Sequence, residues 1–161
     1  MKTIVLIRHA KSSWKDMSLD DYDRPLNIRG KCNLPVMAKH LKGQNIAIDK
    51  IYSSGAKRAK KTAQEFANQL NVSLKIYKTL YMQSENELLG FINKKLSHYD
   101  SVALVGHNPG LTDLYNYICD SCIENIPTSG YVVLQTDSSY IFENSCKLLD
   151  FAYPKREDIL S

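Results

Sequence analysis

A chain of 161 residues, 43% of them hydrophobic, is long enough to bury one core, so we predict a single domain over residues 1–161. A net charge of +4 is too small to indicate nucleic-acid binding, and an ordinary composition argues against disorder. No apolar run approaches the roughly 20 residues of a membrane span, and the sequence shows no signal-peptide pattern. We therefore expect a cytoplasmic protein that binds neither nucleic acid nor membranes.

The first predicted element is a strand at residues 4–7, whose four consecutive apolar residues indicate burial on both faces. The polar residues 11–24 then form a loop that is long for a compact domain, which hints at a functional lid. Asn27 is a suitable N-cap for the helix that follows. Pro35 predicts a kink or a late start in this helix, because proline lacks an amide donor.

Strands and helices alternate along the rest of the chain, which predicts a three-layer α/β/α sandwich with a mostly parallel sheet and an antiparallel edge. Further strands are expected at residues 50–53, 73–77, 101–106, 131–135 and 147–151. Helices are expected after three capping residues: Ser54, Ser84 and Asn108. Ser84 and Glu87 have the spacing of a capping box.

Cys119 and Cys122 form a C-x-x-C pair. A zinc site would need a second pair or nearby histidines, and a redox pair would open a helix rather than follow one. We therefore expect reduced, structural thiols and no metal.

Four residues that suit phosphate chemistry lie at strand–loop–helix junctions: Arg8, His9, Arg58 and His107. The carboxyl ends of parallel strands share one edge of a sheet, so these side chains can converge there. Guanidinium groups bind phosphate oxygens in pairs, and the amides at a helix N-terminus favour an anion beside His107. The pattern indicates a phosphate pocket that contains an imidazole.

Three motifs resemble the signatures of the histidine phosphatase superfamily, which has the phosphoglycerate mutase-like fold. They are R-H-A-K-S-S-W at residues 8–14, S-G-A-K-R-A-K-K-T at residues 54–62 and V-G-H-N-P-G-L at residues 105–111. The short length, D-x-D-R-P-L-N at residues 21–27 and I-P-T-S-G at residues 126–130 are similar to the SixA branch of phosphohistidine phosphatases. The resemblance covers about residues 2–135.

The resemblance implies that His9 is the nucleophile and becomes a phosphohistidine intermediate. It implies that the rest of the phosphate pocket consists of Arg8, Arg58 and His107, with no metal or other cofactor. Three further candidates would bind substrate: Ser12, Lys15 and Asn108. Lys15 stands where related enzymes that act on phosphate esters carry an asparagine.

Such ester-cleaving relatives also carry a glutamate after the third strand as a general acid, and the matching residue here is Met82. Methionine cannot transfer a proton, and the nearby Glu85 and Glu87 are expected to have structural roles. An alkoxide leaving group requires protonation, whereas an imidazole that is already protonated on its far nitrogen departs without it. This difference favours phosphohistidine over sugar phosphates.

We therefore predict a metal-independent phosphatase that acts, as a monomer, on a phosphohistidine-bearing phosphotransfer protein. One alternative is a phosphomonoesterase for a small metabolite or nucleotide, which would need a general acid such as Glu85. The other is a non-catalytic phosphate-binding module, in which the basic helix around Lys57, Lys60 and Lys61 would hold a phosphoprotein or RNA.

Overall fold

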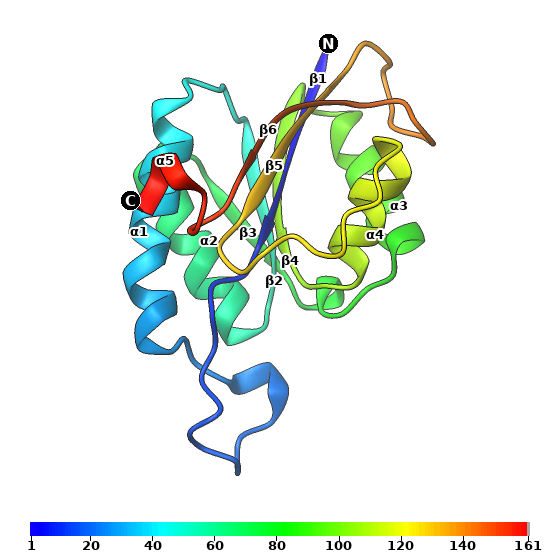
Figure 1. The fold of residues 1–161 in the computed structure, drawn as a ribbon. Helices are drawn as coiled ribbons and strands as arrows, with labels where there is room; N and C mark the ends of the chain where they lie inside the picture. The colour runs from blue at the N-terminus through cyan, green and yellow to red at the C-terminus, as the bar shows by residue number, and fades with distance from the viewer. Residues whose placement is uncertain (161) are drawn as a thin grey trace.

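The computed structural model describes residues 1–160 and contains one six-stranded sheet between two layers of helices (Figure 1). The strands are β1 (Lys2–Arg8), β2 (Lys50–Ser54), β3 (Leu74–Tyr77), β4 (Ser101–Gly106), β5 (Tyr131–Thr136) and β6 (Lys147–Ala152). Their order in the sheet is β3-β2-β4-β1-β5-β6. The predicted α/β sandwich is thus confirmed, and the antiparallel pairings lie at one edge of the sheet, where β5 pairs with β1 and with the edge strand β6.

Helices cover both faces of this sheet. They are α1 (Ile28–Gly43), α2 (Lys57–Leu70), α3 (Glu85–Leu96), α4 (Gly110–Ile118) and α5 (Glu157–Leu160), with short 3-10 turns η1 (Asp21–Asp23) and η2 (Lys78–Leu80). Helices α1, α2 and α5 lie on one face, and α3 and α4 lie on the other (Figure 1). Val5 and Ile7 of β1 pack into the first core, while Ile4 and Leu6 pack into the second. Burial on both faces explains the uninterrupted apolar run.

Helix α1 begins as predicted after Asn27, whose side chain accepts a hydrogen bond from the Gly30 amide at 2.8 Å. It then continues through Pro35, so the expected late start is wrong. Pro35 lies on the exposed side of α1, where water can satisfy the carbonyl that proline leaves unpaired.

The other predicted helix starts fare differently. The capping box of α3 is confirmed, because the side chains and amides of Ser84 and Glu87 bond reciprocally. Helix α2 begins at Lys57 with Ala56 as its N-cap, and α4 begins at Gly110 with Pro109 as its N-cap, so the caps expected at Ser54 and Asn108 are wrong. The Ser54 hydroxyl instead bonds to His107, and the Asn108 side chain bonds to Ile126 and Thr112. None of the helices in residues 1–160 is long and apolar enough to cross a bilayer.

Candidate active site

The four predicted phosphate-binding residues line one cavity of about 360 Å³ at the carboxyl ends of β1, β2 and β4. In the parallel pairing of β1 with β4, Arg8 lies opposite Gly106, so the residues that follow, His9 and His107, are neighbours. Their ring centroids are 5.1 Å apart. Arg58 reaches the same cavity from the first turn of α2. The sheet therefore brings together side chains that are up to a hundred residues apart in sequence.

His9 is held with one ring nitrogen available. Its Nδ1 lies 2.8 Å from the carbonyl oxygen of Ala10, which can only accept, so Nδ1 carries the proton and Nε2 keeps its lone pair. Arg58 Nε lies 3.4 Å from that Nε2. Burial lowers the pKa of His9 to about 3, and the positive charges nearby lower it as well. The hydrogen bond to Ala10 raises this pKa but does not outweigh these effects. At neutral pH, His9 is an uncharged imidazole, as a nucleophile requires.

The Ala10 peptide is itself fixed by α2. The Ala10 amide donates to Thr62 Oγ1 at 2.8 Å, and the Thr62 hydroxyl donates to the carbonyl of Arg58 at 2.8 Å. The same helix that supplies Arg58 therefore holds the carbonyl that orients His9. This coupling links the orientation of His9 to the position of Arg58.

Two buried polar atoms at the site lack partners. His107 Nε2 lies 2.8 Å from Ser54 Oγ, and Arg8 Nη1 donates to the carbonyl of Ile126 at 3.0 Å. Within residues 1–160, however, His107 Nδ1 and Arg8 Nε are buried with no hydrogen-bond partner. An unpaired buried polar atom is costly, which indicates that a ligand with acceptor oxygens completes the site.

Burial also lowers the pKa of His107 to about 4, with Arg58 acting in the same direction. His9 and His107 are thus both neutral at neutral pH, and the positive charge of the cavity comes from the lysine and arginine side chains that line it: Arg8, Lys11, Arg24 and Arg58. An incoming phosphoryl group would bring negative charge and would favour a proton on His107.

Asp21 and Arg24, in the first loop, also line the cavity, and sequence reasoning did not select them. Asp21 binds Arg58 twice, through its backbone carbonyl to Nη1 at 2.6 Å and through Oδ2 to Nη2 at 2.9 Å. Its Oδ1 accepts from Arg24 at 3.0 and 3.1 Å, and the hydroxyl of Tyr81 donates to Oδ2. Partial burial alone would raise the pKa of Asp21, but these hydrogen bonds lower it below its usual range. The D-x-D-R motif at residues 21–24 was the sequence feature that could have pointed to Asp21 and Arg24.

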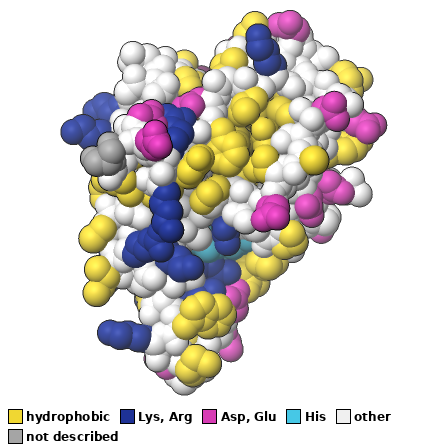
Figure 2. Space-filling view, viewed as in Figure 1, with side chains coloured by type: hydrophobic (Ala, Val, Ile, Leu, Met, Phe, Trp, Pro, Cys, Tyr) yellow, Lys and Arg dark blue, Asp and Glu magenta, His cyan; other side chains and the backbone are white. Residues whose placement is uncertain are grey.

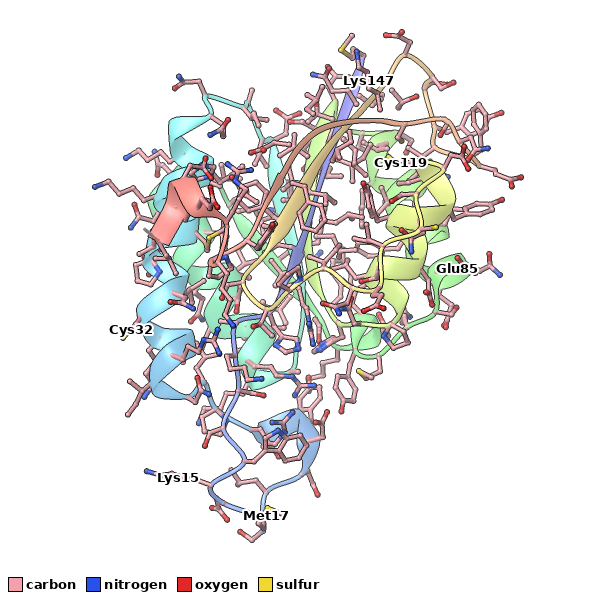
Figure 3. The ribbon with its side chains drawn as sticks, viewed as in Figure 1. Lys15, Met17, Cys32, Glu85, Cys119 and Lys147 are labelled. Carbon is pink, nitrogen blue, oxygen red and sulfur yellow. The ribbon has the colours of Figure 1, made fainter. Side chains whose placement is uncertain are left out.

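The three other substrate-binding candidates differ in their positions relative to the cavity. Ser12 lines the cavity, where its hydroxyl accepts from Arg24 Nη1 at 2.7 Å. Asn108 also lines it, but its amide bonds to Ile126 and Thr112 and so positions the neighbouring loop. Lys15 does not line the cavity; it lies on the outer part of the first loop, where its side chain points into solvent (Figure 3).

The position expected for a general acid does reach the cavity. Met82 lines its rim and is 50% exposed. Glu85 does not line the cavity; it lies on α3, well away from the first loop (Figure 3). Among the residues that line the cavity, Asp21 is the one carboxylic acid, and both of its oxygens are bound. The site therefore offers no free carboxyl group to protonate a leaving group.

The cysteines lie elsewhere in the molecule. Cys119 is half-buried, and desolvation raises the pKa of its thiol to about 12, which disfavours a reactive thiolate. Cys122 is exposed. Within the described residues, no group of three or more His, Cys, Asp or Glu side chains is placed to hold a metal ion.

The low pKa values of His9 and His107 predict how stability depends on pH. An unfolded histidine titrates near pH 6.5, so between about pH 6.5 and about pH 4 the unfolded chain binds more protons than the folded one. We expect the free energy of unfolding to fall as the pH falls through this window. Urea denaturation at a series of pH values measures it.

The variant His9→Ala should show a shallower pH dependence than the wild type, because one of the two depressed groups is gone. The exposed His98→Ala variant is the matched control and should keep the wild-type slope. Equal slopes for the wild type and His9→Ala would contradict the assignment of His9 as a neutral buried imidazole.

Comparison with known proteins agrees with this geometry. Residues 4–81 match the sequence model of the histidine phosphatase superfamily (branch 1). A candidate phosphohistidine phosphatase SixA of Agrobacterium tumefaciens is 28% identical, with a TM-score of 0.81 over 95% of this chain and 98% of that chain. The protein histidine phosphatase SixA solved with tungstate is 22% identical and shares the fold, with a TM-score of 0.81 over 94% and 97% of the two chains.

Curated relatives match over shorter stretches. An uncharacterised chloroplast protein of Arabidopsis thaliana is 28% identical over 145 residues, which are 83% of this chain and 66% of that protein. A 2,3-bisphosphoglycerate-dependent phosphoglycerate mutase of Bartonella henselae is 34% identical over 88 residues, 53% of this chain and 43% of the mutase. The chain thus spans just under two thirds of the first relative and less than half of the second. The chain thus matches the sequence model of the histidine phosphatase superfamily over just under half of its residues and is similar in fold to SixA phosphohistidine phosphatases.

Proposed function

We propose that this protein hydrolyses phosphohistidine on a phosphotransfer protein through a covalent phosphohistidine at His9. The observation that carries the proposal is the state of His9. Its Nδ1 is held by the Ala10 carbonyl, and its unprotonated Nε2 lies beside Arg58 in a cavity lined also by Arg8 and His107. A histidine side chain is visible between Lys and Arg side chains in a hollow of the molecular surface (Figure 2), where a side chain of another protein can reach it.

In the first step, the lone pair of His9 Nε2 attacks the phosphorus in line with the P–N bond of the substrate. That bond breaks, and the substrate imidazole, protonated on its other nitrogen, leaves as a neutral group. His9 keeps its Nδ1 proton and becomes a phosphorylated imidazolium, which the Ala10 carbonyl continues to hold. Arg8, Arg58 and His107 stabilise the charge on the phosphoryl oxygens.

In the second step, a water oxygen attacks the phosphorus and the P–N bond to His9 breaks. Both water protons leave with the product as dihydrogen phosphate, and His9 returns to a neutral imidazole with a proton on Nδ1.

The first step, transfer of the phosphoryl group between two histidines, is nearly balanced in free energy, because the bond that forms is chemically the same as the bond that breaks.

The lining of the cavity supports a P–N substrate over a phosphate ester. An alkoxide leaving group needs a proton in the transition state, and general acids supply about 10²- to 10⁴-fold in rate. Met82 cannot supply this proton, and Asp21 is held as a carboxylate by Arg58, Arg24 and Tyr81. A protonated phosphohistidine needs no such acid.

The variant Met82→Glu tests this leaving-group argument. A carboxyl group at this rim position is expected to raise kcat/KM for a phosphoserine peptide by about 10-fold or more, below the full effect of an optimally placed acid. The rate with a phosphohistidine peptide of the same sequence should change little. Release of inorganic phosphate from both peptides measures the effect.

Met82→Gln is the matched control, because glutamine resembles glutamate in size and polarity but has no acidic proton to donate at neutral pH. It should leave ester hydrolysis at the wild-type level. If the wild type already cleaved phosphoserine as fast as phosphohistidine, the protein would have a general acid elsewhere and the small-molecule phosphomonoesterase would be favoured.

A further inference from the structure

Two hollows adjoin the active-site cavity, and basic side chains line both. The first, of about 510 Å³, contains Lys11, Lys15, Arg29 and Lys31, and the second, of about 360 Å³, contains Lys11, Arg29 and Lys155. Lys11 lines the active-site cavity as well, so the three depressions adjoin one another at this residue. We call these exposed side chains the basic rim: Lys11, Lys15, Arg29, Lys31 and Lys155. Lys and Arg side chains gather in this way around the hollow in Figure 2.

The charge of the basic rim is uncompensated. No Asp or Glu lines either hollow, and no basic-rim residue forms an ion pair within residues 1–160. Arg29 and Lys31 lie in the first turn of α1, which contains no acidic residue, although the helix dipole disfavours cations there. These cations are thus placed where neither their helix nor their neighbours stabilise them, which suits a negatively charged partner.

An exposed aromatic side chain, Trp14, lies between the cavity and the first hollow. The Trp14 indole is 64% exposed and lines both, and the guanidinium carbon of Arg24 lies 3.5 Å from its ring centroid. Arg24 is buried and bound to Ser12 and Asp21, so it holds one face of the indole in place. Ile28, 78% exposed, lines the same hollow. Exposed apolar groups among cations are typical of a protein-binding surface.

We propose that the basic rim and Trp14 form the docking surface for an acidic face of the phosphoprotein substrate. Carboxylates beside the phosphohistidine would contact the basic rim, and an apolar side chain would pack against Trp14. This inference rests on the proposed function and adds the chemistry of the surface that surrounds the phosphohistidine. Charges at a rim act mainly on association, so they should affect KM rather than the chemical step.

Three substrates and two double variants test the proposal. The substrates are a phosphohistidine peptide flanked by Asp and Glu, the same peptide with Asn and Gln at those positions, and phosphoramidate, a small P–N compound. One variant combines Arg29→Gln with Lys31→Gln. The matched control combines Lys60→Gln with Lys61→Gln, two exposed cations of α2 that line none of the three depressions.

At low ionic strength, the wild type should use the acidic peptide about 10-fold better than the neutral one, and added salt should reduce this preference. The Arg29→Gln/Lys31→Gln variant should lose most of the preference through a higher KM, with phosphoramidate turnover unchanged. The control variant should behave as the wild type does.

The docking proposal would be overturned if the wild type used both peptides equally, or if the preference survived in the Arg29→Gln/Lys31→Gln variant. Turnover of phosphoramidate would still support the proposed function in that case. If none of the three substrates were cleaved, both proposals would be overturned. Salt-sensitive binding of single-stranded oligouridine that requires Arg29 and Lys31, without a preference for the acidic peptide, would assign the surface to nucleic acid instead.

Discussion

Replacing His9 with alanine is expected to lower kcat/KM for a phosphohistidine peptide by at least about 10⁴-fold, because the nucleophile is lost and no other group can take its place. His107 is the nearest imidazole, with its ring centroid 5.1 Å from that of His9. Its Nε2 is bonded to Ser54, and its Nδ1 is not held by a carbonyl in the way that orients His9. The measurement is release of inorganic phosphate under single-turnover conditions.

The same experiment should detect the intermediate. Wild-type protein mixed with labelled phosphoramidate and quenched in alkali should carry an acid-labile phosphoryl group, and His9→Ala should carry none. His98→Ala, an exposed histidine outside the cavity, should label as the wild type does. Label on the His9→Ala protein would place the nucleophile elsewhere. Phosphate binding without label in any variant would favour the non-catalytic module.

Replacing Arg58 with alanine is expected to reduce kcat by about 10²- to 10³-fold, the usual effect of removing one donor that stabilises transition-state charge. Arg58 is buried, and its Nε donates a hydrogen bond to His9 Nε2 at 3.4 Å. The side chain also anchors Asp21, so its loss would loosen the first loop over the cavity. Steady-state kinetics that separate kcat from KM give the test.

Two further variants test whether the effect of Arg58→Ala comes from the shape of the guanidinium group or from its charge alone. Arg58→Lys keeps the charge but loses the planar fork, so it should recover only part of the lost kcat. Lys57→Gln removes an adjacent but exposed cation of α2 and should have little effect. If Arg58→Ala raised KM and left kcat unchanged, Arg58 would bind substrate and transition state equally, contrary to the proposed role.

Local sequence predicted the fold well where burial dictates the residue type. The apolar runs of β1 and β4 are continuous because helices cover both faces of the sheet, and their polar ends mark the edge where ligands bind. The capping box at Ser84 is equally local. For the same reason, the convergence of His9 with His107 followed from two strand ends alone.

Positions that depend on the path of a loop are harder to predict. Lys15 lies outside the cavity and lines the adjoining hollow, because its position depends on how residues 11–24 leave the sheet, which no local pattern encodes. Asp21 was missed for the same reason, because its bond to Arg58 joins residues 37 positions apart. Asn108 has the residue type of a helix cap, yet it bonds to the loop at Ile126, a partner that only the tertiary structure provides.

The most direct test of the proposed function compares two peptides of one sequence, one with phosphohistidine and one with phosphoserine at the same position, in single turnover with the wild-type protein. We expect rapid loss of phosphate from phosphohistidine, through an acid-labile phosphoenzyme, and hydrolysis of phosphoserine at least about 100-fold slower because no general acid assists the alkoxide. Equal rates, or faster hydrolysis of phosphoserine, would contradict it.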